Sequence, residues 1–227
     1  MTIPPKIERT QTQNAHLLLI GALQIVLAAE LVALALRGHW LHAFLVAGVM
    51  VVCVGPVLFR KQLPVEVPPQ IQIVVVLFTF ATLFLGEVWS YYERFWWWDL
   101  ALHGTAGLLL GMFGFLAVYI LNENSAVDLH MRPSFVALFA FFFAVGTGAL
   151  WEIFEFGMDQ LFGLTMQKPM LDDLSGLTDT MWDLILDTLG AGIVSVSGWR
   201  YLKRARRTPD QHWLGSFIAR NPRLFGE

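Results

Sequence analysis

The chain has 227 residues, of which 56% are hydrophobic and only 15% are charged, and its formal net charge is −3. Soluble domains carry about 25% charged residues, and the core of one soluble domain of this length cannot bury so much apolar surface. This composition excludes a disordered chain, a nucleic-acid-binding protein and almost any soluble enzyme, and it indicates a membrane protein. The single cysteine, Cys53, excludes a disulfide within the chain.

Six apolar stretches are long enough to cross about 30 Å of hydrocarbon as helices, which rise about 1.5 Å per residue. They cover residues 15–36, 40–59, 70–91, 99–121, 134–159 and 178–199. The first is too long for the apolar part of a signal peptide and no cleavage site stands out, so we expect it to be retained. The sequence therefore predicts an all-α, polytopic membrane protein with six transmembrane helices in a single membrane domain, residues 1–227.

Residues 200–227 form a basic tail after the last stretch. Aromatic and basic side chains cluster where it begins, at Trp199, Arg200, Tyr201, Lys203, Arg204, Arg206 and Arg207. Such clusters anchor helix ends at anionic leaflets, and we prefer this interpretation to nucleic-acid binding. Apolar residues then recur at helical spacing, at Trp213, Leu214, Phe217 and Ile218, and Pro222 follows them. We therefore expect a short amphipathic helix at the membrane interface that ends near the proline.

The lysine and arginine residues predict an orientation. An even number of spans places both termini on one side of the membrane, and 12 of the 15 cations then share that side. The other three are Arg37, Arg94 and Lys168. Because loops rich in Lys and Arg stay in the cytoplasm, we expect a multi-pass membrane protein with both termini in the cytoplasm.

The acidic residues gather on the opposite side. With this orientation, 11 of the 18 lie at or toward the outer side: Glu87, Glu93, Asp99, Glu152, Glu155, Asp159, Asp172, Asp173, Asp179, Asp183 and Asp187. Acidic residues contribute little to membrane topology, so their concentration needs another explanation. We interpret Asp172 and Asp173 as solvated loop residues.

Three groups of polar residues show helical spacing at the outer ends of the last three predicted helices. The groups are Asp99 with His103; Glu152, Glu155 and Asp159; and Asp179 with Asp183, which Asp187 follows one turn deeper. Residues three or four apart share a helix face, so each group forms one stripe. Because the predicted topology brings these three helix ends to the same level, we expect a single polar layer.

This layer indicates a site for a cation. A charged side chain inside a span costs several kcal/mol, and such residues normally face the bundle interior and mark function. The carboxylates would repel one another unless they are protonated, hydrated or bound to a cation. Carboxylates with an imidazole suit Zn, Mn, Fe or Mg. We therefore predict a divalent-metal site with the ligands Asp99, His103, Glu152, Glu155, Asp159, Asp179 and Asp183.

Simpler roles stay open for several of these residues. Asp99 and Asp179 stand at helix starts, where aspartate is a favourable cap. The acids near the end of 134–159 are not explained by capping, because the helix dipole disfavours anions there. Solvation is a sufficient explanation for Asp159, and His103 alone is consistent with a structural hydrogen bond.

Small residues predict close packing of the helices that carry the layer. The glycines of these helices are Gly104, Gly107, Gly111, Gly114, Gly146, Gly148, Gly190 and Gly192. Small residues let membrane helices approach one another closely. We therefore expect the last three helices to form a tight bundle.

Three segments of the chain resemble a known family. They are Trp98-Asp99-Leu-Ala-Leu-His103-Gly-Thr-Ala-Gly107, Trp151-Glu152-Ile-Phe-Glu155-Phe, and Asp179-Thr-Met-Trp-Asp183-Leu followed by Leu189-Gly190-Ala191. Over residues 99–192 the chain resembles the YjdF-like family of uncharacterised bacterial inner-membrane proteins, and it is loosely similar to VanZ-like membrane proteins. The resemblance implies a polytopic protein of a bacterial inner membrane and no particular activity.

Three functions are consistent with the polar layer. The first is metal-dependent chemistry on a lipid or lipid-linked substrate, with Glu155 as the base that accepts a proton from metal-bound water. The second is a structural or assembly subunit whose layer packs the helices or contacts a membrane-protein partner. The third is transport of a cation or proton. The lack of acidic residues between Asp187 and the cytoplasmic side argues against this function. These alternatives leave open whether the protein is an enzyme.

Overall fold

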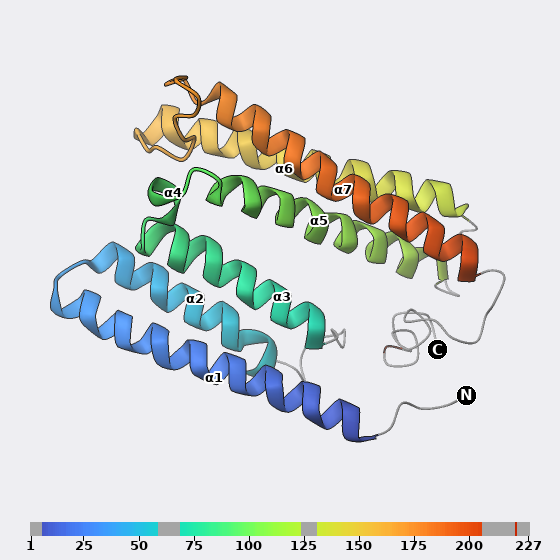
Figure 1. Ribbon diagram of the computed structural model, residues 1–227, viewed down its shortest axis with the longest axis horizontal. Helices are drawn as coiled ribbons and strands as arrows, with labels where there is room; N and C mark the ends of the chain where they lie inside the picture. The colour runs from blue at the N-terminus through green and yellow to red at the C-terminus, as the bar shows by residue number, and fades with distance from the viewer. Residues whose placement is uncertain (1–5, 59–68, 124–130, 206–220, 222–227) are drawn as a thin grey trace. The chain divides into compact units, whose positions relative to one another are not determined.

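The computed structural model describes residues 6–58, 69–123, 131–205 and 221. These residues are almost entirely helical, and among them the only β-type pairing is an isolated bridge between Met170 and Asp173. They form two compact units, one with the described residues up to Phe95 and one with the described residues from Trp96 to Ala205. The helices of each unit can be followed in Figure 1.

The first unit contains a helical hairpin and a further helical segment. Its elements are α1 (Lys6–Leu36), α2 (Trp40–Leu58), α3 (Pro69–Thr79), the π-helical continuation η1 (Phe80–Val88) and the short α4 (Tyr91–Arg94). The turn between α1 and α2 needs Gly38, whose φ of +77° lies in the left-handed region. Apolar side chains from α1, α2, α3 and η1 fill the core of this unit, among them Leu27, Val46, Val76 and Phe84.

The second unit is a bundle of three long helices, α5 (Trp98–Glu123), α6 (Pro133–Phe162) and α7 (Leu177–Ala205). Glycines bring the backbones of α5 and α7 into contact. A Cβ atom at Gly190 would lie 2.6 Å from the carbonyl oxygen of Gly104, and one at Gly107 would lie 2.8 Å from Cα of Asp187. The structure thus shows the close approach of these two helices that the glycines predict, and this approach decides which side chains of α7 reach α5.

The predicted spans coincide with helices, although the helices differ in apolar length. Among the described residues, four segments are long and apolar enough to cross a membrane: Leu17–Leu36, Ile71–Val88, Trp98–Glu123 and Pro133–Phe162. The apolar part of α2, His42–Gly55, is shorter. In α7 only 12 residues separate Asp187 from Arg200, so its aspartates and basic residues interrupt the apolar pattern. The all-helical membrane class is confirmed, and the count of six spans stays a prediction.

Several helix ends differ from the predicted spans. α1 begins at Lys6 and α7 continues to Ala205, because a helix does not stop where its apolar residues stop. Lys203 lies in the last turn of α7, where a cation is favourable, with Nζ 5.2 Å from the ring centroid of Trp199. The third segment ends at Val88 rather than at 91, since Ser90 adopts a left-handed φ of 55°. The predicted interfacial helix near 213–222 lies outside the described residues.

Candidate metal centre

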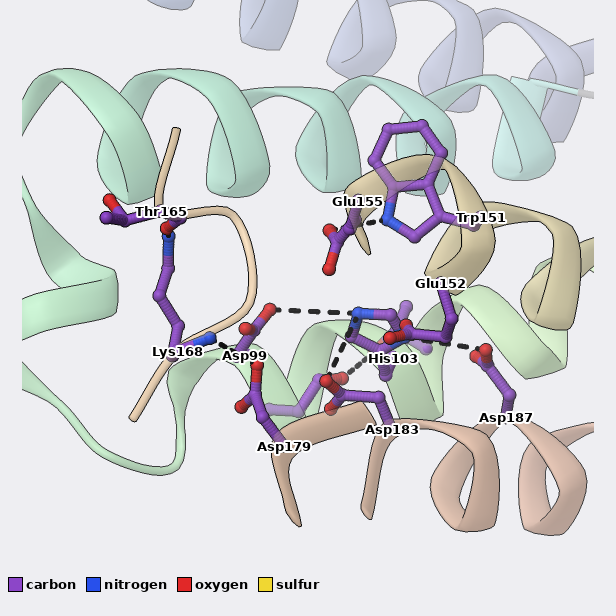
Figure 2. Close-up of polar contacts among 12 residues, drawn as sticks. Asp99, His103, Trp151, Glu152, Glu155, Thr165, Lys168, Asp179, Asp183 and Asp187 are labelled. Atoms are coloured by element: carbon purple, nitrogen blue, oxygen red, sulfur yellow. Dashed lines mark hydrogen bonds and ion pairs between the residues drawn. The ribbon is translucent and has the colours of Figure 1, made fainter. Parts of the chain in front are cut away.

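His103 of α5 lies at the centre of a cluster of acids at one end of the second unit (Figure 2). Its Nε2 atom is 3.8 Å from Asp99 Oδ1 and 3.8 Å from Asp183 Oδ2. Its Nδ1 atom is 3.4 Å from Asp187 Oδ2 and 3.7 Å from Glu152 Oε1. The imidazole ring therefore divides the acids into two pairs, one at each nitrogen.

The antiparallel order of the bundle brings these residues together. α5 and α7 begin, and α6 ends, at the same end of the unit. Asp179, Asp183 and Asp187 follow one another at intervals of four along α7, so they form one stripe. Packing against α5 and α6 buries this stripe, and the three residues are exposed by only 1%, 0% and 1%. We name this set, Asp99, His103, Glu152, Asp179, Asp183 and Asp187, the acidic cluster.

Several carboxylate oxygens of the acidic cluster are buried without a hydrogen-bond donor from the described residues. They include both oxygens of Asp183 and one each of Asp179 and Asp187. The Thr180 hydroxyl lies beside Glu152 but lacks the geometry of a hydrogen bond to it. Buried polar atoms in proteins nearly always have partners, and several acids surround one imidazole here. A bound cation would satisfy these oxygens and balance their charge.

Three members of the acidic cluster offer ligand atoms close enough together to be candidates for binding one metal ion. Asp99, His103 and Asp183 each offer one ligand atom, and these atoms lie within 4.8 Å of one another. Metal–ligand bonds of about 2.0–2.2 Å allow two donors on one ion to be at most about 4.4 Å apart. The two Nε2–oxygen distances of 3.8 Å are within this limit. We name these three residues the metal triad.

Glu155 of α6 lies outside the metal triad. Its Oε1 atom accepts a hydrogen bond of 2.8 Å from Trp151 Nε1, one turn earlier on the same helix. The residue is buried, and its carboxylate points toward the pair of Asp99 and His103 (Figure 2). The structure therefore places Glu155 beside the acidic cluster and outside the metal triad.

Asp159 and Asp179 hold the connector between α6 and α7, residues 163–176. Asp159 accepts backbone N–H groups of Met166 at 2.7 Å and Gln167 at 2.9 Å. Asp179 accepts the backbone N–H of Lys168 at 2.6 Å. The structure therefore places Asp159 in a structural contact, separate from the acidic cluster, while Asp179 contributes both to the cluster and to the connector.

Asp173 lies in the loop before α7, as the sequence predicts, and its carboxylate also caps this helix. Its carboxylate accepts the N–H of Ser175 at 2.8 Å and that of Thr178 at 2.9 Å, together with both hydroxyl groups. These bonds, first from Ser175 and then from Thr178, hold the pKa of Asp173 well below its usual range. Capping by Asp173 leaves Asp179 free to face the connector.

Two participants are absent from the predicted ligand set. Asp187 lies within hydrogen-bond distance of Nδ1 of His103. The sequence could have indicated this residue, because it stands one helical turn after Asp183. Gly148 of α6 lies against the Asp187 carboxylate, since a Cβ atom there would be 3.1 Å from Cγ of Asp187. The glycines predict close packing of these helices, but they do not predict that Gly148 meets Asp187, because this contact joins two helices.

Comparison with known proteins gives the family. A family model described as "Predicted membrane protein (DUF2238)" matches residues 15–204. The chain belongs to this membrane-protein family. The DUF2238 match contains the whole acidic cluster, whereas the resemblances to YjdF-like and VanZ-like proteins stay predictions.

The chain is also similar to an individual protein. An uncharacterized protein of Thermotoga maritima is 31% identical over 136 residues, which cover 60% of this chain and 65% of that relative. The chain thus matches slightly less than two thirds of its relative's length. No solved structure matches the chain.

Proposed function

We propose that this DUF2238 protein binds a divalent metal ion at the metal triad and uses it for chemistry on a lipid or lipid-linked substrate. One observation carries the proposal. Asp183 is completely buried, neither of its oxygens meets a donor among the described residues, and one of them lies 3.8 Å from His103 Nε2. A buried charge is stable only when it is paired, and an imidazole with carboxylates is a common ligand set for Zn, Mn or Fe.

A metal here would supply hydrolytic chemistry. A metal ion lowers the pKa of a bound water and polarises a carbonyl or phosphoryl oxygen. Glu155 points toward Asp99 and His103 from α6, and it is the carboxylate we propose as the base. Asp99 is the most exposed residue of the metal triad, with 17% of its side chain accessible, so we propose that substrate approaches from its side.

The substrate class follows from the surface around the connector. Large apolar side chains are exposed from the end of α6 to the start of α7, at Leu161, Phe162, Leu164, Leu171, Leu174 and Leu177. In a membrane protein, such side chains are stable in contact with lipid. A substrate that reaches the acidic cluster past this surface would itself be amphiphilic, which favours a lipid or a lipid-linked molecule.

One observation favours the alternative of a structural subunit. The backbones of α5 and α7 touch at Gly107 and Gly190, directly beside the acidic cluster. A polar layer that only locks these helices together would need such packing and no metal. Metal binding separates the two proposals.

The first test measures bound metal. We expect the purified protein in detergent to bind close to one Zn²⁺ or Mn²⁺ per chain, determined by mass spectrometry after equilibrium dialysis. Asp99→Asn should weaken binding about 100-fold, because outer partners of metal ligands alone contribute 10–100-fold. Asp99 suits this test because it is the least buried member of the triad, so its replacement disturbs the core least.

The matched control is Asp159→Asn, the same chemical change at a carboxylate that holds backbone N–H groups outside the cluster. It should bind metal as the wild type does. A wild-type protein without bound divalent metal at saturating concentrations would contradict the proposed function.

We also propose six spans, with both termini in the cytoplasm and the acidic cluster at the outer side. The distribution of 12 of the 15 cations supports this orientation. Alkaline phosphatase fused after Gly163 should be active in cells, and the same enzyme fused after Glu227 should be inactive. The reverse pattern would place the acidic cluster at the cytoplasmic side.

A further inference from the structure

We propose that Asp187 is a positioning residue that keeps the proton of His103 on Nδ1 and so presents Nε2 to a metal in the triad. This inference rests on the proposed metal site. Its basis is the contact of 3.4 Å between His103 Nδ1 and Asp187 Oδ2, two buried groups that lie 84 residues apart in the chain. The inference assigns a role to the residue at Nδ1, the ring nitrogen that faces neither Asp99 nor Asp183.

The two nitrogens of His103 need different protonation states. A neutral imidazole has one N–H donor and one acceptor nitrogen, and only the acceptor binds a metal. Nε2 faces Asp99 and Asp183, so a metal held by the triad would bind Nε2, and the proton would then reside on Nδ1. Asp187 is within hydrogen-bond distance of Nδ1, whereas Glu152 at 3.7 Å is not. Carboxylates that accept such a proton orient metal-binding histidines and raise their basicity.

Two glycines lie against Asp187, one at its carboxylate and one at its backbone. A Cβ atom at Gly148 of α6 would collide with Oδ2 of Asp187 and lie 3.1 Å from its Cγ. A Cβ atom at Gly107 of α5 would collide with the backbone oxygen of Asp187. Asp187 is thus enclosed by α5 and α6 from two directions, and any larger side chain at 148 must push its carboxylate away from the ring.

The glycine contacts supply variants that leave Asp187 itself unchanged. Gly148→Ala should displace the carboxylate, while Gly146→Ala, two residues earlier on α6, meets no atom within 4 Å. Asp187→Asn removes the charge with almost no change in shape. The amide can also donate to Nδ1, which would move the imidazole proton to Nε2 and block the metal ligand.

Cu²⁺ is a suitable probe, because it binds nitrogen and oxygen ligands most tightly of the first-row divalent metals. Chelator-treated protein receives one equivalent of Cu²⁺, and its affinity is measured by competition with a chelator. Electron spin echo modulation reports the hydrogen bond of the imidazole nitrogen that is remote from copper. His103→Gln assigns the signal to this ring, since the chain has 6 histidines.

In the wild type and in Gly146→Ala, we expect the imidazole nitrogen remote from copper, Nδ1 of His103, to carry a hydrogen-bonded proton. In both Asp187→Asn and Gly148→Ala, the remote-nitrogen signal should change, and Cu²⁺ affinity should fall about 10–100-fold. A residue that only fills space would not alter the remote nitrogen, so this readout distinguishes positioning from packing. Thermal unfolding without metal checks that each variant is folded. If Gly148→Ala does not fold, the result for Asp187→Asn alone tests the positioning role.

Two outcomes would overturn the inference in different ways. If the wild type binds Cu²⁺ through His103 and Asp187→Asn changes neither the affinity nor the remote-nitrogen signal, the positioning role is wrong and the metal site stands. If the wild type shows no binding that depends on His103, the proposed metal site fails together with the inference.

Discussion

Asp183→Asn should raise the stability of the metal-free protein and abolish its stabilisation by metal. Asp183 is 0% exposed, and neither oxygen meets a donor among the described residues. A buried carboxylate that faces several other acids and a single imidazole is costly, and asparagine removes its charge while keeping its shape. The amide of asparagine can also donate to neighbouring carboxylates of the acidic cluster, such as that of Asp99. In chelator, the variant should therefore melt at a higher temperature than the wild type.

Metal should reverse this order. A ligand present at 100 times its Kd stabilises a folded protein by about 2.7 kcal/mol. For a chain of this size that corresponds to a rise in Tm of about 5–10 °C. The wild type should show this rise with Zn²⁺ or Mn²⁺, and Asp183→Asn should show almost none. Thermal unfolding in detergent, with and without chelator, measures both effects in one experiment.

Asp159→Asn is again the matched control. Its carboxylate already accepts two backbone N–H groups, so losing its charge should lower Tm slightly in both conditions and leave the metal-induced rise unchanged. If the wild type does not respond to metal and Asp183→Asn lowers Tm in chelator, the polar layer is structural. That result would favour the assembly-subunit alternative.

Gly190→Ala should cause a large loss of stability, because the added methyl group would meet the backbone of the neighbouring helix. Its Cβ atom would lie 2.6 Å from Gly104 O and 2.8 Å from Leu108 N, which are backbone atoms of α5. Backbone atoms cannot rotate away as a side chain can, so α7 must move outward. Overpacking of this kind costs about 1–3 kcal/mol. Because Asp183 and Asp187 precede Gly190 on α7, the same movement should weaken metal binding.

Gly192→Ala is a control on the same helix. Its Cβ atom would lie 4.0 Å from the Phe141 ring, an ordinary contact, and alanine is the better helix former by about 1 kcal/mol. This variant should be as stable as the wild type or more stable, and it should bind metal normally. Equal losses in both glycine variants, measured by thermal unfolding and metal titration, would contradict the argument from backbone contact.

Much of the helical framework could be predicted from the sequence. Apolar stretches of sufficient length mark helices because backbone polar groups in lipid must be satisfied within the segment. The intervals of four between Asp99 and His103, and along the aspartates of α7, predicted shared faces for the same local reason. Helix ends were less predictable, as Ser90 and the extension of α7 past Trp199 show, because local backbone geometry and charge decide them.

The sequence by itself determined that this is a helical membrane protein whose acids recur at helical spacing on its last three helices. Only the tertiary structure decided which of those acids meet. The rotation of α6 and α7 about their axes turns Asp187 and Glu152 toward Nδ1 of His103 and leaves Asp159 to hold the connector. It also presses Gly148 against Asp187, a contact between distant parts of the chain. Local periodicity specifies the face on which a residue lies, but contacts between helices depend on how the whole bundle packs.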